Sequence, residues 1–219
     1  MPGHRCCISV SVPDGPENLL SELRVSRETV ERLEAHRVLL MAWSGRMNLI
    51  GPGELDEYWR RHALDSAQLV QLAPEAQTWV DLGSGAGFPG LVVACCLAGR
   101  EGAEVTLIEA NQRKATFLRE AARATGAPAK VIAARAEDVP AFARHVVTAR
   151  AFAPLWRIIE HAKPWLDHGA TGLFLKGEDV EAELAVASQH WALKAEILPS
   201  LSDPRGRIVR VEGASRVRT

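Results

Sequence analysis

A glycine-rich stretch, DLGSGAGFPG at residues 81–90, directly follows an apolar segment at 78–82 that is predicted to be a strand. Three of its glycines are spaced two residues apart, so each can adopt positive φ and bring bare backbone close to a ligand. They are Gly83, Gly85 and Gly87. Pro89 suits the first turn of a following helix, whose free amides can face a ligand. The stretch predicts a loop that holds a nucleotide-like ligand.

Two acidic residues help to decide between NAD, FAD and S-adenosylmethionine, which all bind to such loops. Asp81 directly precedes the loop, where its carboxylate would repel a pyrophosphate but suits the ammonium and sulfonium of S-adenosylmethionine. Glu109 ends the next predicted strand, where a carboxylate can accept from both ribose hydroxyls. Each acid alone could instead cap a helix or face solvent, but together they favour S-adenosylmethionine. A dinucleotide oxidoreductase is further disfavoured because the single tyrosine, Tyr58, belongs to no Tyr-x-x-x-Lys pair.

Charged groups also follow the later predicted strands. The tetrad RAED at 135–138 follows the third strand, where an adenine would reach, although an acid-rich helix start explains it equally well. Arg150 and Lys176 end the fourth and fifth strands, at the edge where doubly wound sheets bind ligands. Either cation can pair with the carboxylate of S-adenosylmethionine or with a phosphate of a nucleic acid. Arg207, in the last strand-like run, is either a solvated edge residue or an RNA contact.

Two polar side chains interrupt the apolar face of a helix predicted at 55–73. His62 and Ser66 share that face with five apolar or aromatic residues, so they need polar partners. The five are Leu55, Tyr58, Trp59, Leu69 and Val70. Either His62 is a core histidine bonded by Asp65 or Ser66, or it has a functional role. Asn48, just past the first long helix, has a helix-capping or turn role as its structural alternative.

The order of elements predicts an α/β fold. A helical region with segments at 27–43 and 55–73 precedes strands that alternate with helices, which is typical of a parallel sheet covered on both faces. Strands are predicted at 78–82, 104–109, 129–133, 146–150, 171–176, 192–198 and 207–211, and helices between them at 89–98, 111–125, 136–143, 154–164 and 178–189. The last two strands are joined by a short connection, so we expect a mainly parallel seven-stranded sheet with one antiparallel edge strand.

The totals fit one large domain with an extension: the chain has 219 residues, 47% hydrophobic and 24% charged. No apolar run is long enough to cross a bilayer and no signal peptide is evident, so we expect a cytoplasmic protein. The four cysteines form two adjacent pairs, which fits neither a zinc site nor a CxxC motif, and we expect no metal. With a net charge of −1, any nucleic-acid surface must come from local clusters. Basic clusters occur at 60–62, 113–123 and 205–218.

Several ordered motifs carry a family resemblance beyond the glycine loop and Glu109. They are MNLI (47–50), RRHALDSAQL (60–69), AARAED (133–138), TARAFAPL (148–155) and LKG (175–177). With them the chain resembles the RsmG/GidB family of bacterial small-subunit rRNA guanine-N7 methyltransferases from about residue 41 to 211. The resemblance implies a Rossmann-like class I methyltransferase domain at 77–213, a helical N-terminal extension at 17–76, a poorly defined segment at 1–16 and a tail at 214–219. Members often have an aspartate where this chain has His145.

The same resemblance implies that S-adenosylmethionine is the donor and a guanine in the 530 loop of 16S rRNA the acceptor, free or within the 30S subunit, for an enzyme expected to act as a monomer. The implied catalytic residues are Asn48, His62, Arg150 and Lys176. The implied donor-binding residues are Asp81, Gly83, Ser84, Gly85, Gly87, Phe88, Glu109, Ala136, Glu137 and Arg150, and the implied RNA-binding residues are Arg135, Lys176 and Arg207. Arg205 competes with Arg207 for the basic position of the C-terminal motif RGRIVRV.

Guanine N7 carries a lone pair and no proton, so the expected reaction is an in-line displacement without a general base, in which the enzyme positions the reactants and excludes water. Two alternatives use the same residues. One is a methyltransferase of a small molecule or a protein, and the other is a non-catalytic RNA-binding assembly factor that keeps the pocket. The basic clusters disfavour the first, and the intact glycines, Glu109, Arg150 and Lys176 disfavour the second.

Overall fold

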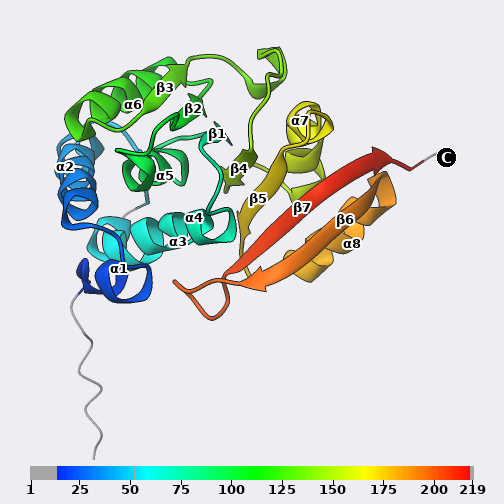
Figure 1. Cartoon of the computed structure of the whole chain (residues 1–219), viewed down its shortest axis with the longest axis horizontal. Coiled ribbons are helices and arrows are strands. Elements are labelled where there is room, and N and C mark those ends of the chain that lie inside the picture. The colour runs from blue at the N-terminus through cyan, green and yellow to red at the C-terminus, as the bar shows by residue number, and fades with distance from the viewer. Residues whose placement is uncertain (1–13, 52, 218–219) are drawn as a thin grey trace, which may run out of the picture.

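The structure is a computed structural model that describes residues 14–51 and 53–217. These residues form one twisted sheet with helices on both faces, and a long ribbon of two strands, β6 and β7, extends from one end of it (Figure 1). The segment predicted at 1–16 lies almost wholly outside the described residues, as do Cys6 and Cys7. The other two cysteines, Cys95 and Cys96, are free thiols.

Seven strands build the sheet in the order β3-β2-β1-β4-β5-β7-β6. Their bounds are β1 (Thr78–Leu82), β2 (Glu104–Ile108), β3 (Ala129–Ile132), β4 (Val146–Arg150), β5 (Thr171–Lys176), β6 (Trp191–Pro199) and β7 (Arg207–Arg216). Neighbours from β3 to β5 are parallel, whereas β7 is antiparallel to both β5 and β6. The predicted sheet is confirmed, with β7 as the antiparallel strand and β6 outside it. Since the strand order reverses between β1 and β4, the ligand crevice of a doubly wound fold lies there.

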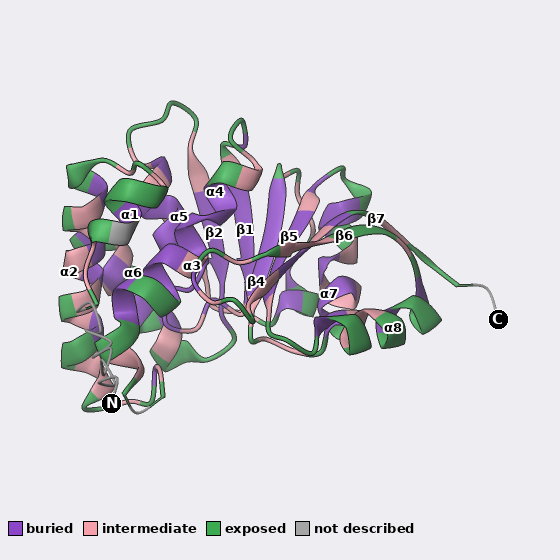
Figure 2. Ribbon diagram, turned by 90° about the horizontal axis from the view of Figure 1, so that it is seen from below, coloured by how far each residue is buried: buried purple, intermediate pink, exposed green. Residues whose placement is uncertain are grey.

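Two apolar cores form on the two faces of the sheet because side chains alternate along each strand. Trp79 and Leu107 belong to the first core, and their neighbours Val80 and Ile108 belong to the second. The helices are α5 (Gly90–Leu97) and α6 (Gln112–Thr125) over the first core, and α7 (Leu155–Asp167) and α8 (Val180–His190) over the second. Figure 2 shows the central strands buried between these layers, while β6 and the far end of β7 are largely exposed.

The N-terminal extension is helical, as predicted, but its second half is divided. Its elements are α1 (Glu17–Glu22), α2 (Arg27–Ser44), η1 (Glu54–Glu57), η2 (Tyr58–Leu64), α3 (Asp65–Ala67) and α4 (Leu69–Leu72). The Ser26 hydroxyl caps α2 by accepting from the Thr29 amide at 3.2 Å. The single helix predicted at 55–73 is a run of short segments in which η2 is a π-helix, a geometry that often occurs at functional sites.

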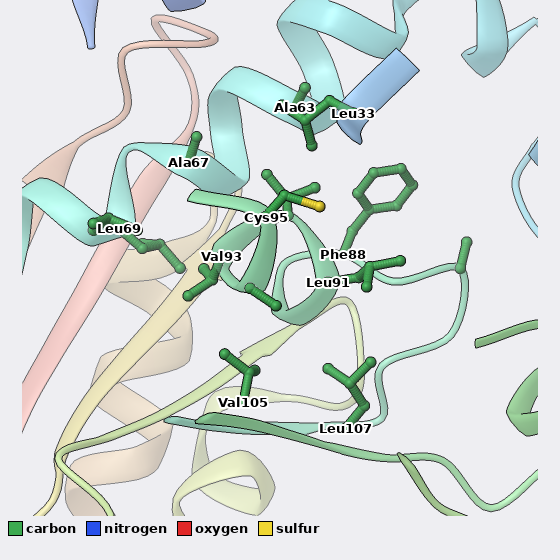
Figure 3. Close-up of a cluster of buried hydrophobic side chains, with 14 of the residues drawn as sticks. Leu33, Ala63, Ala67, Leu69, Phe88, Leu91, Val93, Cys95, Val105 and Leu107 are labelled. Carbon is green, nitrogen blue, oxygen red and sulfur yellow. The ribbon is translucent and has the colours of Figure 1, made fainter. Parts of the chain in front are cut away.

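The extension shares the first core with the sheet domain. Helix α2 packs on α6, and α3 packs on α5. Figure 3 shows side chains of the extension beside side chains of the loop before α5, of α5 itself and of β2. The labelled ones are Leu33, Ala63, Ala67 and Leu69 from the extension, and Phe88, Leu91, Val93, Cys95, Val105 and Leu107 from the domain. The two parts therefore bury a common apolar surface.

The prediction of a helix at 136–143 is wrong. Only one turn of 3₁₀-helix forms there, η3 (Ala136–Asp138), and the chain then runs irregularly to β4. Pro140 explains the difference, because a proline lacks the amide that a helix needs and disfavours helical backbone at the residue before it, Val139. The final strand is also longer than predicted, since β7 continues to Arg216.

Candidate active site

The glycine loop between β1 and α5 has the backbone that its sequence predicts. Gly83, Gly85 and Gly87 all have positive φ, at 70°, 54° and 96°. A side chain at Gly83 is excluded for two reasons: the positive φ, and the Phe152 ring, which would lie 2.3 Å from an added Cβ. The Gly83 and Ser84 amides both donate to the carbonyl of Ile108, at 2.9 and 3.0 Å. The loop is therefore fixed to the end of β2.

Asp81 lies beneath this loop. Its side chain is fully buried, and its Oδ2 accepts from the Gly90 amide at 3.1 Å, so the carboxylate holds the first residue of α5. Among the described residues Oδ1 has no hydrogen-bond partner, and burial raises the pKa of the group to about 7. Asp81 lines none of the three cavities described below. Its contact with a bound donor stays a prediction.

Glu109 joins the glycine loop to the turn after β2. Its Oε2 accepts from the Gly85 amide at 2.9 Å and its Oε1 accepts from the Asn111 amide at 2.8 Å. The side chain is nearly buried, yet it lines a cavity. Each carboxylate oxygen can accept a further hydrogen bond, so Glu109 is placed to hold hydroxyl groups of a ligand in that cavity.

Three adjoining cavities lie along the carboxyl ends of the strands. The β2–β3 cavity, of about 380 Å³, is lined by residues that include Gly83, Glu109, Arg135, Ala136, Glu137 and Phe152. The glycine-loop cavity, of about 790 Å³, is lined by residues that include Asn48, Glu54, Ser84, Gly85, Phe88, Lys114 and Arg150. The β4–β5 cavity, of about 540 Å³, is lined by residues that include Glu54, His62, Asp65, Arg150, Lys176 and Arg205.

The cavities meet at the end of β4. Ala151 lines all three of them and has a positive φ of 49°, a backbone conformation that is strained for a residue with a side chain. Arg150 lines the glycine-loop and β4–β5 cavities. A ligand in the glycine-loop cavity and another in the β4–β5 cavity would thus face each other across these two residues.

Arg150 is held by groups of the extension. Its Nη1 donates to the Arg61 carbonyl at 3.3 Å and lies 3.8 Å from Oδ2 of Asp65, while the guanidinium carbon lies 4.7 Å from the centre of the Phe88 ring. Burial lowers the pKa of Arg150 from its usual range, but the group stays charged. Arg150, which was predicted to bind a ligand, is thus a charged side chain that its contacts with Arg61, Asp65 and Phe88 hold in place.

His62 is a buried neutral side chain in the wall of the β4–β5 cavity. Its ring stacks on Phe88 with 4.7 Å between ring centres, and its Nε2 lies 3.7 Å from Oε2 of Glu54. Burial, and then the charge of Arg150, lower its pKa to about 3. Neither ring nitrogen has a hydrogen-bond partner among the described residues, since Ser66 donates instead to the His62 carbonyl at 2.6 Å. The expected bond from Asp65 or Ser66 to this ring does not form.

The other predicted residues fall into separate places. Lys176 lines the β4–β5 cavity but is also engaged, with its Nζ 2.7 Å from Oε2 of Glu183 and donating to the Ala153 carbonyl at 3.3 Å. Asn48 lines the glycine-loop cavity, and the exposed Arg135 lines the β2–β3 cavity. Arg207 lines none of the three cavities and donates to the carbonyls of Pro204 and Gly206, at 2.7 and 2.8 Å.

Arg205, rather than Arg207, reaches the β4–β5 cavity, where it lies 3.5 Å from Asp203. At the head of β4, His145 takes a structural role, because its Nδ1 accepts from the amides of Gln77 and Thr78 at 3.1 and 3.3 Å. A carboxylate at that position could accept from the same amides. The departure from the family pattern is thus compatible with the fold.

Sequence reasoning missed His36, and it considered Asp65 only as a partner of His62. His36 is fully buried, with its Nε2 2.9 Å from the Ala86 carbonyl in the glycine loop and its Nδ1 3.0 Å from the Tyr58 hydroxyl. Its spacing from the buried Leu33 and Leu40 was the available signal. Asp65 Oδ1 accepts hydrogen bonds from the hydroxyls of Ser200 and Ser202, at 3.0 and 2.7 Å. These partners lie more than 130 residues away in the sequence, so no local pattern reveals them.

The sheet order, the glycine loop and the cavities at the carboxyl ends of the strands define a Rossmann-like methyltransferase fold. Two solved structures share it: a mutant of MtNAS in complex with S-adenosylmethionine (TM-score 0.57, 16% identity, 90% of this chain and 79% of that chain) and a SAM dependent methyltransferase from Aquifex aeolicus (TM-score 0.54, 12% identity, 80% and 97%). The family profile described as rRNA small subunit methyltransferase G matches residues 29–207. The chain belongs to this family.

Its similar relatives include proteins named ribosomal RNA small subunit methyltransferase G. The one from Caulobacter vibrioides is 50% identical over 86% of this chain and 87% of the relative, and the one from Parvibaculum lavamentivorans is 49% identical over 92% and 93%. In the part of the chain that the structure describes, no helix could span a membrane, and no three or more His, Cys, Asp or Glu side chains group as they would around a metal ion.

Proposed function

We propose that the protein transfers a methyl group from S-adenosylmethionine to N7 of a guanine in the 530 loop of 16S rRNA. The observation that carries this proposal is the meeting of the three cavities at Ala151, next to Arg150, which lines two of them. It supports a donor in two of the cavities and an acceptor base in the third. Membership of the rRNA small subunit methyltransferase G family and the names of the relatives support rRNA as the substrate.

The residues of the first two cavities fit the donor. Glu109 offers a carboxylate to two ribose hydroxyls in the β2–β3 cavity, where Ala136 and Glu137 would border the adenine. Gly83 and Gly85 line both cavities, and the lack of side chains there lets a ligand approach the backbone. Lys114 and Arg150 line the glycine-loop cavity, where either cation would pair with the carboxylate of the methionine part. Asp81 would support this site from below by fixing α5.

The mechanism needs orientation more than proton transfer. S-adenosylmethionine supplies, when bound, a methyl group carried on a sulfonium. Guanine N7 has no proton to lose, and His62, with a pKa of about 3, is a neutral imidazole at neutral pH and supplies no positive charge. The stacked rings of His62 and Phe88 form an aromatic wall that excludes water beside the acceptor. Arg150 and Lys176 orient the base and its phosphate.

The RNA side of the proposal is the rim of the β4–β5 cavity. Arg61, Arg150, Lys176 and Arg205 line it, and a cluster of cations can hold phosphates of an unstacked nucleotide. Asn48 lines the neighbouring cavity and would border the base from the donor side. Arg135 and Arg207 do not line this cavity and would meet RNA outside it. The proposed setting is a monomer in the cytoplasm that acts on the 30S subunit or its precursor.

Methyl transfer to RNA tests the proposal directly. Purified protein and methyl-labelled S-adenosylmethionine are incubated with 30S subunits, or with free 16S rRNA, from cells that lack this protein, and 7-methylguanosine is mapped by chemical cleavage. We expect one new 7-methylguanosine in the 530 loop. Subunits from cells that contain the protein are the control and should accept little label. Label on a protein or a small molecule, or on another atom of the RNA, would contradict the proposal.

A further inference from the structure

Three residues line both the glycine-loop cavity and the β4–β5 cavity: Glu54, Arg150 and Ala151. If the donor occupies the first cavity and the acceptor the second, as proposed above, the methyl group crosses between them. Side chains on this border are then the ones that the reacting base touches. Ala151 has no polar side-chain atom, so Arg150 and Glu54 are the border groups that can recognise a base by hydrogen bonds.

Glu54 is an available acceptor in a fixed position. Its Oε2 accepts from the Gly51 amide at 3.1 Å, which holds the side chain against the turn before η1. Its Oε1 lies 3.6 Å from Nη2 of Arg61, which is longer than a hydrogen bond. The side chain is 32% exposed, so a ligand can reach it. Glu54 therefore presents unused lone pairs at the border.

Arg150 and Glu54 each approach a different part of Arg61. The Arg61 carbonyl accepts from Arg150, and the Arg61 guanidinium approaches Glu54. Arg150 uses only Nη1 in that bond, so its other N–H groups remain available to a ligand. The border thus presents a set of donors next to an acceptor.

This pattern matches guanine and opposes adenine. Going round the ring from N7, guanine presents an acceptor at O6 and then donors at N1 and N2, whereas adenine presents a donor at N6 and then an acceptor at N1. We propose that Glu54 determines base specificity by accepting from N1–H and N2–H₂ of the target guanine, while Arg150 donates to O6. An adenine in the same place would set donor against donor and acceptor against acceptor. The proposal rests on the proposed function, since it assumes that N7 faces the donor.

Inosine tests the N2 part of this contact, because it lacks the N2 amine but keeps N7, O6 and N1–H. The experiment compares kcat/KM on 16S rRNA with guanosine or with inosine at the target position, for the wild type and for Glu54→Gln. The glutamine side chain adds donors where the base also donates. The matched control is Glu57→Gln, which removes an exposed acid of the same turn that also approaches Arg61, at 3.4 Å.

We expect the wild type to use inosine about 10-fold to 100-fold less well than guanosine, in line with the discrimination that one paired hydrogen-bonding contact gives. Glu54→Gln should lose a similar factor on guanosine and then distinguish the two bases by less than about 3-fold. Glu57→Gln should behave as the wild type. Thermal unfolding of Glu54→Gln, compared with that of the wild type, will show whether the variant is folded.

Two results overturn the assignment of Glu54: a wild type that uses inosine as well as guanosine, or a Glu54→Gln variant that discriminates as strongly as the wild type. The first needs no variant, so a folding defect cannot hide it. If the wild type places no methyl on guanosine N7, the proposed function itself fails. Methylation of guanosine N7 with equal use of inosine leaves the function standing and removes only the role of Glu54.

Discussion

Replacing Gly83 by alanine is expected to weaken donor binding more than it weakens the fold. The residue has a φ of 70°, where an alanine costs about 1–2 kcal/mol. For a chain of 219 residues this corresponds to a fall in Tm of roughly 2–8 °C. The new Cβ would also lie 2.3 Å from the Phe152 ring, while ordinary contact begins at 3.4 Å, so the ring must retreat by 3.4 − 2.3 = 1.1 Å.

This retreat is the reason to expect a binding defect. Phe152 lines the β2–β3 cavity, so its displacement moves a wall of the proposed donor site. Overpacking of a filled site costs about 1–3 kcal/mol, so we expect S-adenosylmethionine to bind about 10-fold to 100-fold more weakly. Calorimetry measures the affinity, and thermal unfolding measures the stability.

Gly99→Ala is the matched control. Gly99 has a similar φ of 88°, but an added Cβ would meet nothing within 4 Å, so only the backbone cost should appear. A second control is Gly83→Ala combined with Phe152→Ala, which removes the clash and should bind the donor about as well as Phe152→Ala alone. If Gly83→Ala loses stability as Gly99→Ala does but keeps the wild-type affinity, the loop does not hold the donor in the way that we infer.

Three further predictions concern buried or cavity-lining groups. Burial lowers the pKa of His36 from 6.5 to about 4, so the unfolded state binds more protons than the folded state below pH 6.5. On acidification from neutral pH to about pH 5, the free energy of unfolding should therefore fall by about 2 kcal/mol more in the wild type than in His36→Gln. Urea unfolding at neutral pH and at about pH 5 measures the difference. Equal losses of stability in the two proteins would show that another group is responsible for the acid sensitivity. Glu109→Gln should weaken donor binding about 10-fold or more by calorimetry, through the ribose contact and the Gly85 amide; unchanged affinity would show that the ribose lies elsewhere. Lys176→Ala should lower kcat/KM on rRNA at least 10-fold with donor affinity unchanged, and near-normal turnover would remove its assigned role.

The sheet was predictable because its strands follow local patterns. Runs such as 78–82 and 146–150 are short and mainly apolar between turn signals, and the structure places β1 and β4 on those residues. The prediction of a helix at 136–143 was wrong because the acid-rich sequence at its start resembles a helix N-terminus, while Pro140 prevents the helix from continuing. Local sequence fixes where an element starts better than how far it runs.

The site was predictable where a residue follows a strand. The positions of Gly83, Glu109, Arg150 and Lys176 follow from strand ends alone, because parallel strands end at one edge of the sheet. The links between those residues and the extension were not predictable. The bond of His36 to the Ala86 carbonyl joins residues 50 apart, and the network around Asp65 reaches loop 200–206. Lys114 was counted only as one basic residue of a helix, although it lines two of the cavities.

The apolar surface that the extension and the sheet domain bury together makes the N-terminal helices a structural requirement of the catalytic half. A truncated protein that starts near residue 77 would leave one side of α5 facing water and would lose the imidazole that bonds to the Ala86 carbonyl. The whole chain should therefore melt in a single cooperative transition, and efforts to engineer a smaller enzyme should leave the N-terminal helices intact.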